Sequence, residues 1–344
     1  MAVITIIGAG MMGSGMSRPA RDNGHEVRLV GTPLDREIIR EASISGRHVP
    51  MKRKLPDGIK YYQIEDVKTA LQGTDYIICG ASSFGVDWFA DEMLPILPDG
   101  IPVLSVTKGL LDDEQGNLMT FPEFLASRMA KERNISFSAI GGPCTSYELM
   151  DKHQTMVYFC GPDKAVLEQF KALLQTEYYH VETSTDIRGV EGCVAMKNAY
   201  AVAVSMAIGM AERLDGKDAY MYNPQAALFG QSIREMTRIV RLLGGNGDLA
   251  GGIPGAGDLF VTIFGGRTRR LGYLLGYGKT YAEAKEELKG VTLESVVIIT
   301  RMSRAIRKMA AQGKVDPADF ALLLFLDSVI NQGAVADIPW NTFR

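Results

Sequence analysis

One lysine stands among apolar residues in a way that could serve proton transfer. Lys197 lies in a stretch with helical periodicity, and its neighbours at helical spacing are Cys193, Val194, Tyr200 and Ala201. A lysine is rarely surrounded by such residues without a partner. Its amine could reach water along its apolar stem. Alternatively it could face a cleft, where desolvation would suit it to general acid–base chemistry.

A glycine-rich segment further along carries an acid, a hydroxyl and an arginine. If a helix begins near Asp258, then Asp258 and Thr262 share one face at an i,i+4 spacing. The glycines that follow present Arg267, and such an arginine can bind an oxyanion through two parallel hydrogen bonds. Asp258 could instead serve only as a helix N-cap. The cluster predicts a pocket for a phosphate group.

A second lysine follows an apolar run. Lys108 stands in Ser105-Val106-Thr107-Lys108-Gly109, directly after the predicted strand Val103–Val106. Open α/β sheets bind their ligands at the carboxyl ends of strands. Lys108 is therefore a candidate site residue, and the alternative is a lysine that is simply solvated.

The N-terminal segment has the pattern of a dinucleotide-binding turn. Gly8, Gly10 and Gly13 fit GxGxxG directly after the apolar run Val3–Ile7 and before a helix that we expect to reach about Asn23. Such glycines make a tight turn, admit a pyrophosphate and let the helix pack on the strand. A plain connecting turn is the alternative. The pattern predicts that NAD or NADP binds at the turn residues Gly8, Ala9, Gly10, Met11, Met12, Gly13 and Ser14.

The end of the second predicted strand bears on the choice of cofactor. After Val30 no acid is placed to accept a hydrogen bond from a ribose 2′-hydroxyl. Thr32 and Arg36 could instead meet a 2′-phosphate, although Asp35 and Glu37 dilute that charge and a surface arginine is often only solvated. The pattern favours NADP, or dual use of both cofactors.

The elements that must position these residues differ between the two halves of the chain. Short apolar runs alternate with amphipathic segments in the first half, and the strand candidates are Val3–Ile7, Glu26–Val30, Tyr76–Cys79, Val103–Val106, Phe137–Ile140 and Met156–Cys160. This alternation predicts an α/β domain with a Rossmann-type, doubly wound, mostly parallel sheet. Beyond His180, helical periodicity over Gly189–Leu214, Pro224–Leu243 and Leu293–Ala311 predicts an all-α C-terminal domain. We place the boundary in the polar stretch Thr183–Arg188, which divides the chain into residues 1–187 and 188–344, and we expect the site between the two domains.

Composition excludes several classes of protein. The 344 residues are 46% hydrophobic with a net charge of −3, so no general attraction to nucleic acid or anionic lipid is expected. The chain begins almost at once with a strand-like run and no secretory signal pattern, which predicts a cytoplasmic protein. Its longest apolar stretch, Val194–Met210, is too short and too polar at one end to span a membrane. The scattered cysteines and histidines lack metal-ligand spacing, so we expect reduced thiols and no metal.

Taken in order, the motifs resemble those of NAD(P)-dependent glycerol-3-phosphate dehydrogenases of the bacterial and archaeal type. The resemblance extends over essentially the whole chain. Its motifs are GAGxxGS at Gly8–Ser14, TKG at Thr107–Gly109, GP at Gly142 and Pro143, GVEG at Gly189–Gly192, KN at Lys197 and Asn198, GxGDLxxT at Gly255–Thr262 and GGR at Gly265–Arg267. It implies hydride transfer between sn-glycerol 3-phosphate and dihydroxyacetone phosphate, within carbohydrate metabolism and phospholipid biosynthesis.

The resemblance also implies roles for individual residues. Lys197 would be the general acid that protonates the carbonyl oxygen, Asp258 would hold and tune it, and Lys108 would stabilise the developing oxyanion. The residues expected to bind the substrate and its phosphate are Asn198, Thr262, Arg267 and Lys108, and those expected to adjoin the cofactor beyond the turn are Lys108, Arg267 and Glu294. Three stretches differ from the usual family pattern, namely Cys144–Ser146, Thr268 and Val291–Ser295.

Two alternatives remain beside this interpretation. The same chemistry could act on a larger sugar phosphate or on a non-phosphorylated hydroxy acid. A cofactor-binding sensor without catalysis is a further alternative, but it would not require Lys108, Lys197 and Asp258 together. We also expect that the protein could form a homodimer.

Overall fold

The computed structural model describes residues 1–112 and 118–344. Two compact units emerge: the first contains Met1–Lys108 and Met119–Val190, and the second contains Gly109–Leu118 and Glu191–Arg344. The chain therefore enters the second unit twice. No feature of the sequence predicted that the short segment after Lys108 belongs to the helical unit.

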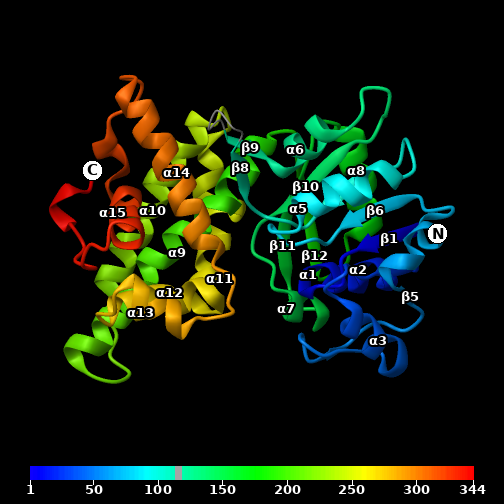
Figure 1. Ribbon diagram of the computed structural model, residues 1–344, viewed down its shortest axis with the longest axis horizontal. Coiled ribbons are helices and arrows are strands. Elements are labelled where there is room, and N and C mark those ends of the chain that lie inside the picture. The colour runs from blue at the N-terminus through cyan, green and yellow to red at the C-terminus, as the bar shows by residue number, and fades with distance from the viewer. Residues whose placement is uncertain (113–117) are drawn as a thin grey trace. The chain divides into compact units, whose positions relative to one another are not determined.

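The first unit is built on one eight-stranded sheet, seen among its helices in Figure 1. The strand order is β12-β11-β10-β7-β6-β1-β2-β5. Neighbouring strands are parallel except β10 and β11. The strands are β1 (Val3–Ile7), β2 (Glu26–Val30), β5 (Lys60–Tyr62), β6 (Tyr76–Cys79), β7 (Val103–Ser105), β10 (Phe137–Gly141), β11 (Thr155–Cys160) and β12 (Tyr179–Ser184). The predicted Rossmann-type, mostly parallel sheet is confirmed.

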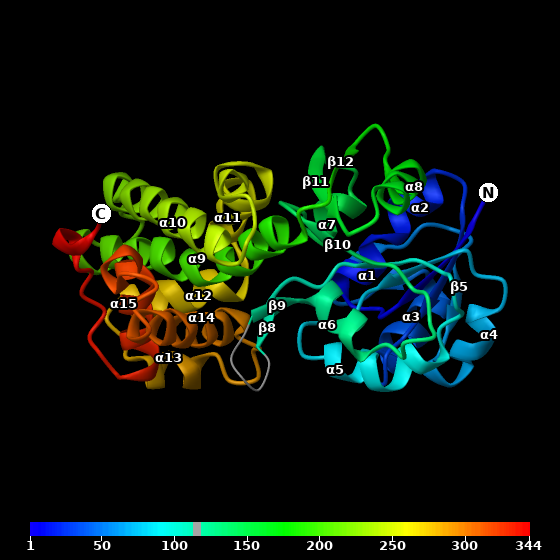
Figure 2. The same ribbon diagram turned by 90° about the horizontal axis from the view of Figure 1, so that it is seen from above.

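Helices cover both faces of this sheet. Figure 2 shows α2 and α8 on one side of the strands and α4, α5 and α6 on the other. The helices of this unit are α1 (Met11–Gly15), α2 (Ser17–Asp22), α3 (Arg36–Ser45), α4 (Val67–Leu71), α5 (Val86–Trp88), α6 (Phe121–Arg128), α7 (Ser146–Met150) and α8 (Lys164–Leu174). An antiparallel pair adds β3 (Arg47–His48) and β4 (Arg53–Lys54) to this unit. A further two-stranded sheet joins β8 (Leu110–Asp112), which belongs to the second unit, with β9 (Leu118–Thr120).

Two details of the first unit differ from the sequence-based expectation. The edge strands β5 and β12 were not predicted, because each is partly exposed and lacks a continuous apolar run. The single helix expected to reach Asn23 is two helices that meet at Met16. Pro19 explains the break, since it has no N–H to donate to the carbonyl of Gly15.

The second unit is helical, as predicted. Its helices are α9 (Ile187–Asp215, from Glu191 onward in this unit), α10 (Tyr222–Leu242), α11 (Asp258–Phe264), α12 (Gly266–Gly276), α13 (Tyr281–Glu287), α14 (Glu294–Ala311) and α15 (Ala321–Asn331). By length and composition alone α9 could cross a membrane, but 78% of its apolar window is buried inside the fold. It is the central helix of an apolar core that also includes Leu110 of β8.

Glycines bring the backbones of α9 and α12 into direct contact. A Cβ added to Gly276 would lie 1.9 Å from the carbonyl oxygen of Met206, and one added to Gly272 would lie 2.4 Å from that of Val202. From the α9 side, a Cβ on Gly209 would lie 2.1 Å from the oxygen of Tyr273. No larger residue fits at these positions, so the glycines set how α9 and α12 cross.

Candidate active site and dinucleotide turn

The three glycines of the N-terminal turn have different surroundings, and these explain differently why a glycine stands at each position. Gly8 has φ +114°, and a Cβ there would lie 2.5 Å from the backbone of Gly80 after β6. A Cβ on Gly13 would lie 2.1 Å from the oxygen of Gly8. Gly10 has no atom within 4 Å of its Cβ position, so nothing in the described chain requires a glycine there. An open approach at the middle glycine is what a dinucleotide pyrophosphate needs, and the turn fits NAD(P) in this respect.

Polar side chains hold the turn from behind. Asp35 Oδ2 accepts a hydrogen bond from the Ala9 N–H at 3.1 Å. The Ala9 carbonyl accepts from His48 Nε2 at 2.9 Å and from Ser14 Oγ at 3.1 Å. His48 has no motif around it and was assigned no role from the sequence, and Asp35 was considered only as a charge that offsets Arg36. The carboxylate of Asp35, the residue before α3, therefore lies near the carboxyl end of β2, where no suitably placed acid was predicted.

The two residues predicted to meet a 2′-phosphate have partners within the first unit. Thr32 Oγ1 donates to Asp35 Oδ2 at 2.8 Å. Arg36 pairs with Glu65, and more than half of each side chain is exposed to solvent. Such an exposed pair contributes little and can be exchanged for another anion.

Lys108 lies at the carboxyl edge of the sheet, as predicted. It follows β7, and its Nζ donates to the carbonyl of Gly142 after the neighbouring strand β10 at 2.7 Å. Thr107 Oγ1 donates to the carbonyl of Ala81 after β6 at 2.7 Å. The ends of β6, β7 and β10 are thereby tied together around Lys108.

In the second unit Lys197 and Asp258 form a buried ion pair. Lys197 on α9 is 8% exposed and Asp258 is 1% exposed, and Lys197 Nζ donates to Asp258 Oδ1. Asp258 is the first residue of α11, whose N-cap is Gly257 without a side-chain cap. The lysine is therefore not held in solvent and the aspartate is not a capping residue. A buried charge of this kind is retained only with a partner.

Other predicted residues of this unit lie on the same or neighbouring helices. Thr262 Oγ1 donates to the carbonyl of Asp258 at 2.7 Å, and Asn198 follows Lys197 on α9, half-buried. Arg267, near the start of α12, has its guanidinium 3.5 Å from a carboxylate oxygen of Glu294 at the start of α14. The structure thus joins Lys197 with Asp258, and Arg267 with Glu294.

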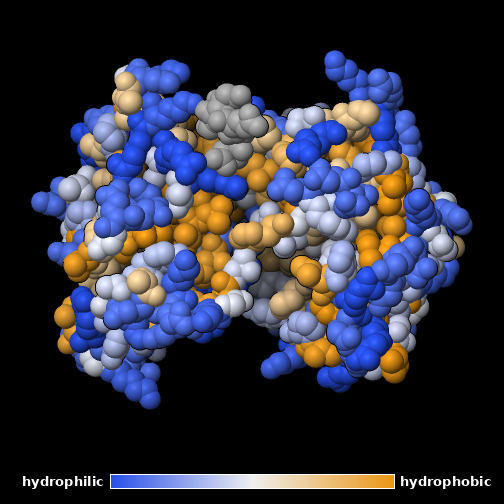
Figure 3. All heavy atoms as spheres, viewed as in Figure 1, coloured by the Kyte–Doolittle hydropathy of each residue, from blue (hydrophilic) through white to orange (hydrophobic). Residues whose placement is uncertain are grey.

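The surface around these helices is partly apolar. Figure 3 shows hydrophilic residues over much of the viewed face, with apolar residues between them. On α11, Phe260 and Phe264 are 55% and 64% exposed, and their rings meet edge to face with centroids 4.8 Å apart. The helix that buries Asp258 on one side therefore presents aromatic rings on the other.

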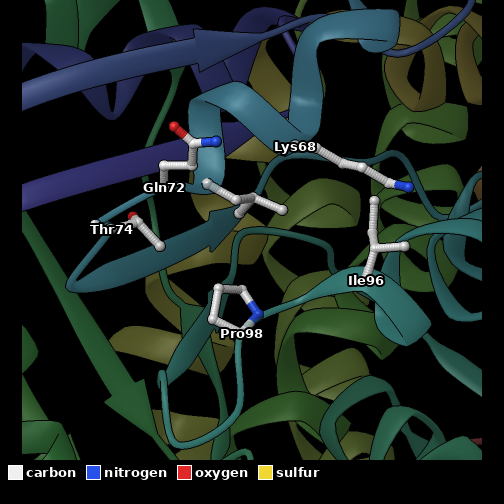
Figure 4. A pocket seen from close by; sticks show the side chains of 7 residues that line it. Lys68, Gln72, Thr74, Ile96 and Pro98 are labelled. Atoms are coloured by element: carbon white, nitrogen blue, oxygen red, sulfur yellow. The ribbon is translucent and has the colours of Figure 1, made fainter.

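A groove elsewhere in the first unit is not the predicted site. It has a volume of about 630 Å³ and is lined by Lys68, Leu71, Gln72, Gly73, Thr74, Ile96 and Pro98. Figure 4 shows these side chains around the end of α4 and the approach to β6. This is the amino-terminal end of that strand, opposite the carboxyl edge that carries Gly8 and Lys108.

The described residues include no group of three or more His, Cys, Asp or Glu side chains that could hold a metal ion. None of the four cysteines forms a disulfide within the described residues, and Cys79, Cys160 and Cys193 are buried. Burial raises the pKa of Cys79 to about 11, which disfavours its reactive thiolate. The three buried thiols lie in the core, as expected from the sequence, whereas Cys144 is only half-buried at its margin.

Comparisons with known proteins match both halves of the chain. Residues 3–166 match the N-terminal and residues 186–337 the C-terminal family model described as NAD-dependent glycerol-3-phosphate dehydrogenase. The chain is 34% identical over 333 residues to the NADP(+)-dependent glycerol-3-phosphate dehydrogenase of Archaeoglobus fulgidus, covering 96% of each chain. It is 31% identical over 343 residues to a glycerol-3-phosphate dehydrogenase [NAD(P)+] of Lactobacillus delbrueckii, covering 98% of this chain and 95% of that one.

The fold has the same relatives. The solved structure of glycerol-3-phosphate dehydrogenase from Coxiella burnetii superposes with a TM-score of 0.80 at 22% identity, covering 97% of this chain and 96% of that one. At this identity the likeness concerns the fold alone.

Proposed function

Because the chain belongs to the NAD-dependent glycerol-3-phosphate dehydrogenase family, we propose that it interconverts sn-glycerol 3-phosphate and dihydroxyacetone phosphate. The observation that carries the proposal is the buried pair of Lys197 and Asp258. A desolvated amine held by a carboxylate can donate and regain a proton at a fixed position. Neither a sensor nor a plain binding fold needs such a pair.

Lys197 is the proton donor in this proposal. Reduction of the ketone adds a hydride at carbon and a proton at oxygen, and a bound nicotinamide supplies the hydride. Lys197 Nζ gives its proton to the carbonyl oxygen, and in the reverse direction takes the proton from the alcohol. Asp258 keeps the ammonium in one orientation and stabilises its charge while the site is dry.

The substrate phosphate is assigned to the start of α12. Arg267 has a planar fork of donors that suits a phosphate, and its present partner Glu294 is about one-third exposed. Asn198 and Thr262 supply an amide and a hydroxyl on the helices that carry Lys197 and Asp258. The role assigned to Lys108 is to stabilise a developing oxyanion, which its positive charge suits.

The coenzyme is assigned to the turn from Gly8 to Ser14, with NADP preferred. The relative from Archaeoglobus fulgidus is described as NADP(+)-dependent, and the exposed Arg36 can exchange Glu65 for a 2′-phosphate at small cost. Calorimetric titration with NADPH and NADH tests this preference, and Arg36→Ala should weaken NADPH about fivefold while leaving NADH unchanged. Tighter binding of NADH to the wild-type protein would reverse the assignment, with Asp35 as the feature that explains it.

The reaction itself is tested by the loss of NADPH or NADH absorbance with dihydroxyacetone phosphate and, for comparison, with larger ketose phosphates. Non-phosphorylated hydroxy acids are tested in the other direction, by the gain of absorbance with the oxidised coenzymes. We expect rapid oxidation with dihydroxyacetone phosphate. Turnover only with a larger phosphate would move the substrate assignment. Activity limited to non-phosphorylated substrates would remove it.

Arg267 is tested against a neighbouring arginine. Arg267→Ala should raise the KM for dihydroxyacetone phosphate by about 10- to 100-fold, the size of a lost charge-assisted interaction. Arg270 on the same helix is exposed and serves as the matched control, since Arg270→Ala should leave KM within about twofold. Equal effects of the two variants would show that only the general positive charge of α12 matters.

A further inference from the structure

We propose that His48 is a positioning residue that aims the Gly10 N–H of the glycine-rich turn toward the coenzyme pyrophosphate. This inference rests on the proposed function, because it assumes that the turn binds NAD(P). It concerns a residue outside the GxGxxG motif, which comes instead from the hairpin of β3 and β4.

The tautomer of His48 follows from its two partners. Its side chain is fully buried, with Nε2 2.9 Å from the carbonyl oxygen of Ala9 and Nδ1 3.1 Å from the backbone nitrogen of Met51. A carbonyl only accepts, so Nε2 carries the hydrogen. A backbone N–H only donates, so Nδ1 carries none. Both ring nitrogens are therefore in use, Nε2 as a donor and Nδ1 as an acceptor.

The orientation of one peptide group follows from that hydrogen bond. The peptide between Ala9 and Gly10 is trans, as no cis bond occurs in the described chain. In a trans peptide the C=O and the next N–H point in opposite directions. His48 and Ser14 draw the Ala9 carbonyl into the protein, so the Gly10 N–H is turned outward.

The outward side of Gly10 is the open side of the turn. Nothing lies within 4 Å of the position of a Cβ on Gly10, and its N–H has no acceptor in the described part of the chain. Asp35 fixes the preceding peptide by accepting from the Ala9 N–H. The turn is thus held ready, with an outward amide where a phosphate oxygen would accept.

Two substitutions separate the two hydrogen bonds of His48. In His48→Gln the amide nitrogen lies near the place of Nε2 and can still donate to Ala9, while the bond from Met51 is lost. In His48→Asn the amide oxygen lies near the place of Nδ1 and can still accept from Met51, while the bond to Ala9 is lost. The pair serves as its own matched control for local packing.

The measurement is calorimetric binding of NADH and NADPH to the full chain, together with thermal unfolding and steady-state kinetics. We expect His48→Asn to raise the Kd of both coenzymes about tenfold, the effect of one hydrogen bond. The KM for coenzyme should rise in parallel while kcat at saturation stays within about twofold. His48→Gln should bind coenzyme within about threefold of the wild type.

If both variants weaken binding equally and in step with their loss of thermal stability, His48 is only structural and the inference is wrong. Should His48→Asn fail to fold, Ser14→Ala removes the other donor to the same carbonyl and should weaken coenzyme binding about threefold. Unchanged binding in Ser14→Ala would then contradict the inference. Wild-type protein that binds neither coenzyme would instead overturn the proposed function, which is a separate result.

Discussion

The dinucleotide turn and the Lys197 site reach a defined geometry by opposite means. In the first unit the functional groups are backbone amides, and two polar side chains, the half-buried Asp35 and the buried His48, hold them from behind. In the second unit the functional group is a side chain, and the helices that carry it are set by close packing at Gly272 and Gly276. The first site is therefore sensitive to lost hydrogen bonds, and the second to added volume.

The difference explains what each site tolerates. A turn built from backbone can accept many side chains, provided that its glycines and its supporting donors and acceptors remain. A side-chain site depends on the identity of one residue and on the distance between two helix axes. Four changes test this contrast, from the largest expected effect to the smallest.

The largest effect is expected from removing the proton donor. Lys197→Met should lower kcat by about 10³-fold, within the usual contribution of general acid–base catalysis, and leave the Kd of NADPH within about twofold. Because this variant leaves Asp258 buried without its cation, Lys197→Met/Asp258→Asn serves as the control for folding. Turnover close to that of the wild type in a folded variant would remove Lys197 from the mechanism.

The next effect tests the helix crossing. Gly276→Ala should lower the free energy of unfolding by about 3 kcal/mol, because the added Cβ would fall 1.9 Å from the oxygen of Met206. Gly230 in α10 has nothing within 4 Å of its Cβ position, so Gly230→Ala should stabilise the protein by up to about 1 kcal/mol. Chemical denaturation measures both, and equal effects would mean that close packing does not define the second unit.

The same logic distinguishes two glycines of the turn. Gly10→Ala should leave the melting temperature nearly unchanged, since its φ of −64° suits alanine and the space is open. It should nevertheless weaken coenzyme binding about thirtyfold by blocking close approach. Gly13→Ala, in contrast, should lower both coenzyme affinity and the melting temperature, because its Cβ would lie 2.1 Å from the oxygen of Gly8. A stable Gly10→Ala protein with unchanged coenzyme affinity would place the pyrophosphate elsewhere.

The smallest effect is a pH dependence in the first unit. Burial alone would raise the pKa of Asp22, but hydrogen bonds from Lys152 and Tyr178 outweigh it and lower the pKa. A carboxyl with a lowered folded pKa contributes stability above its ordinary pKa of about 4, and this is lost as the pH falls through the folded value. Asp22→Asn should therefore cost about 1 kcal/mol at pH 7 and progressively less as the pH falls below the ordinary pKa of about 4.

The exposed Asp57 is the matched control for this measurement, since its pair with Lys54 is largely solvated and Asp57→Asn should change little at any pH. A loss that stayed constant from pH 7 to pH 3 would mean that Asp22 acts through packing and not through its charge.

Much of the fold was predictable, because periodicity reports burial. β1 and β2 have the bounds read from their apolar runs, and α9 begins and ends within two residues of its predicted range. Edge strands such as β12 were not predicted, because their partly exposed residues interrupt the apolar run that marks a buried strand. The assignment of Gly109–Leu118 to the second unit was not predicted, because no turn or change in composition marks the point where the chain passes from one unit to the other.

Site residues were predictable only where the chemistry leaves a trace in the sequence. Lys197 was visible because a charge among apolar residues is unusual, and its pairing with Asp258 followed from the family resemblance. His48 was invisible, since its role depends on a hairpin that brings it to Ala9 across 39 positions. The cytoplasmic location, the possible homodimer and the division at residues 187 and 188 stay predictions.

Because Gly109–Leu118 belongs to the second unit, the C-terminal half of the sequence does not contain all of that unit. Leu110 is buried in the core of the second unit, and Arg301 of α14 donates to its carbonyl at 2.9 Å. A gene fragment that begins at residue 188 would encode every long helix of that half and still lack this strand. Expressing the two halves of the sequence separately would leave a gap in the apolar core of the second unit. We therefore expect that recombination between relatives preserves function only when both halves come from the same parent.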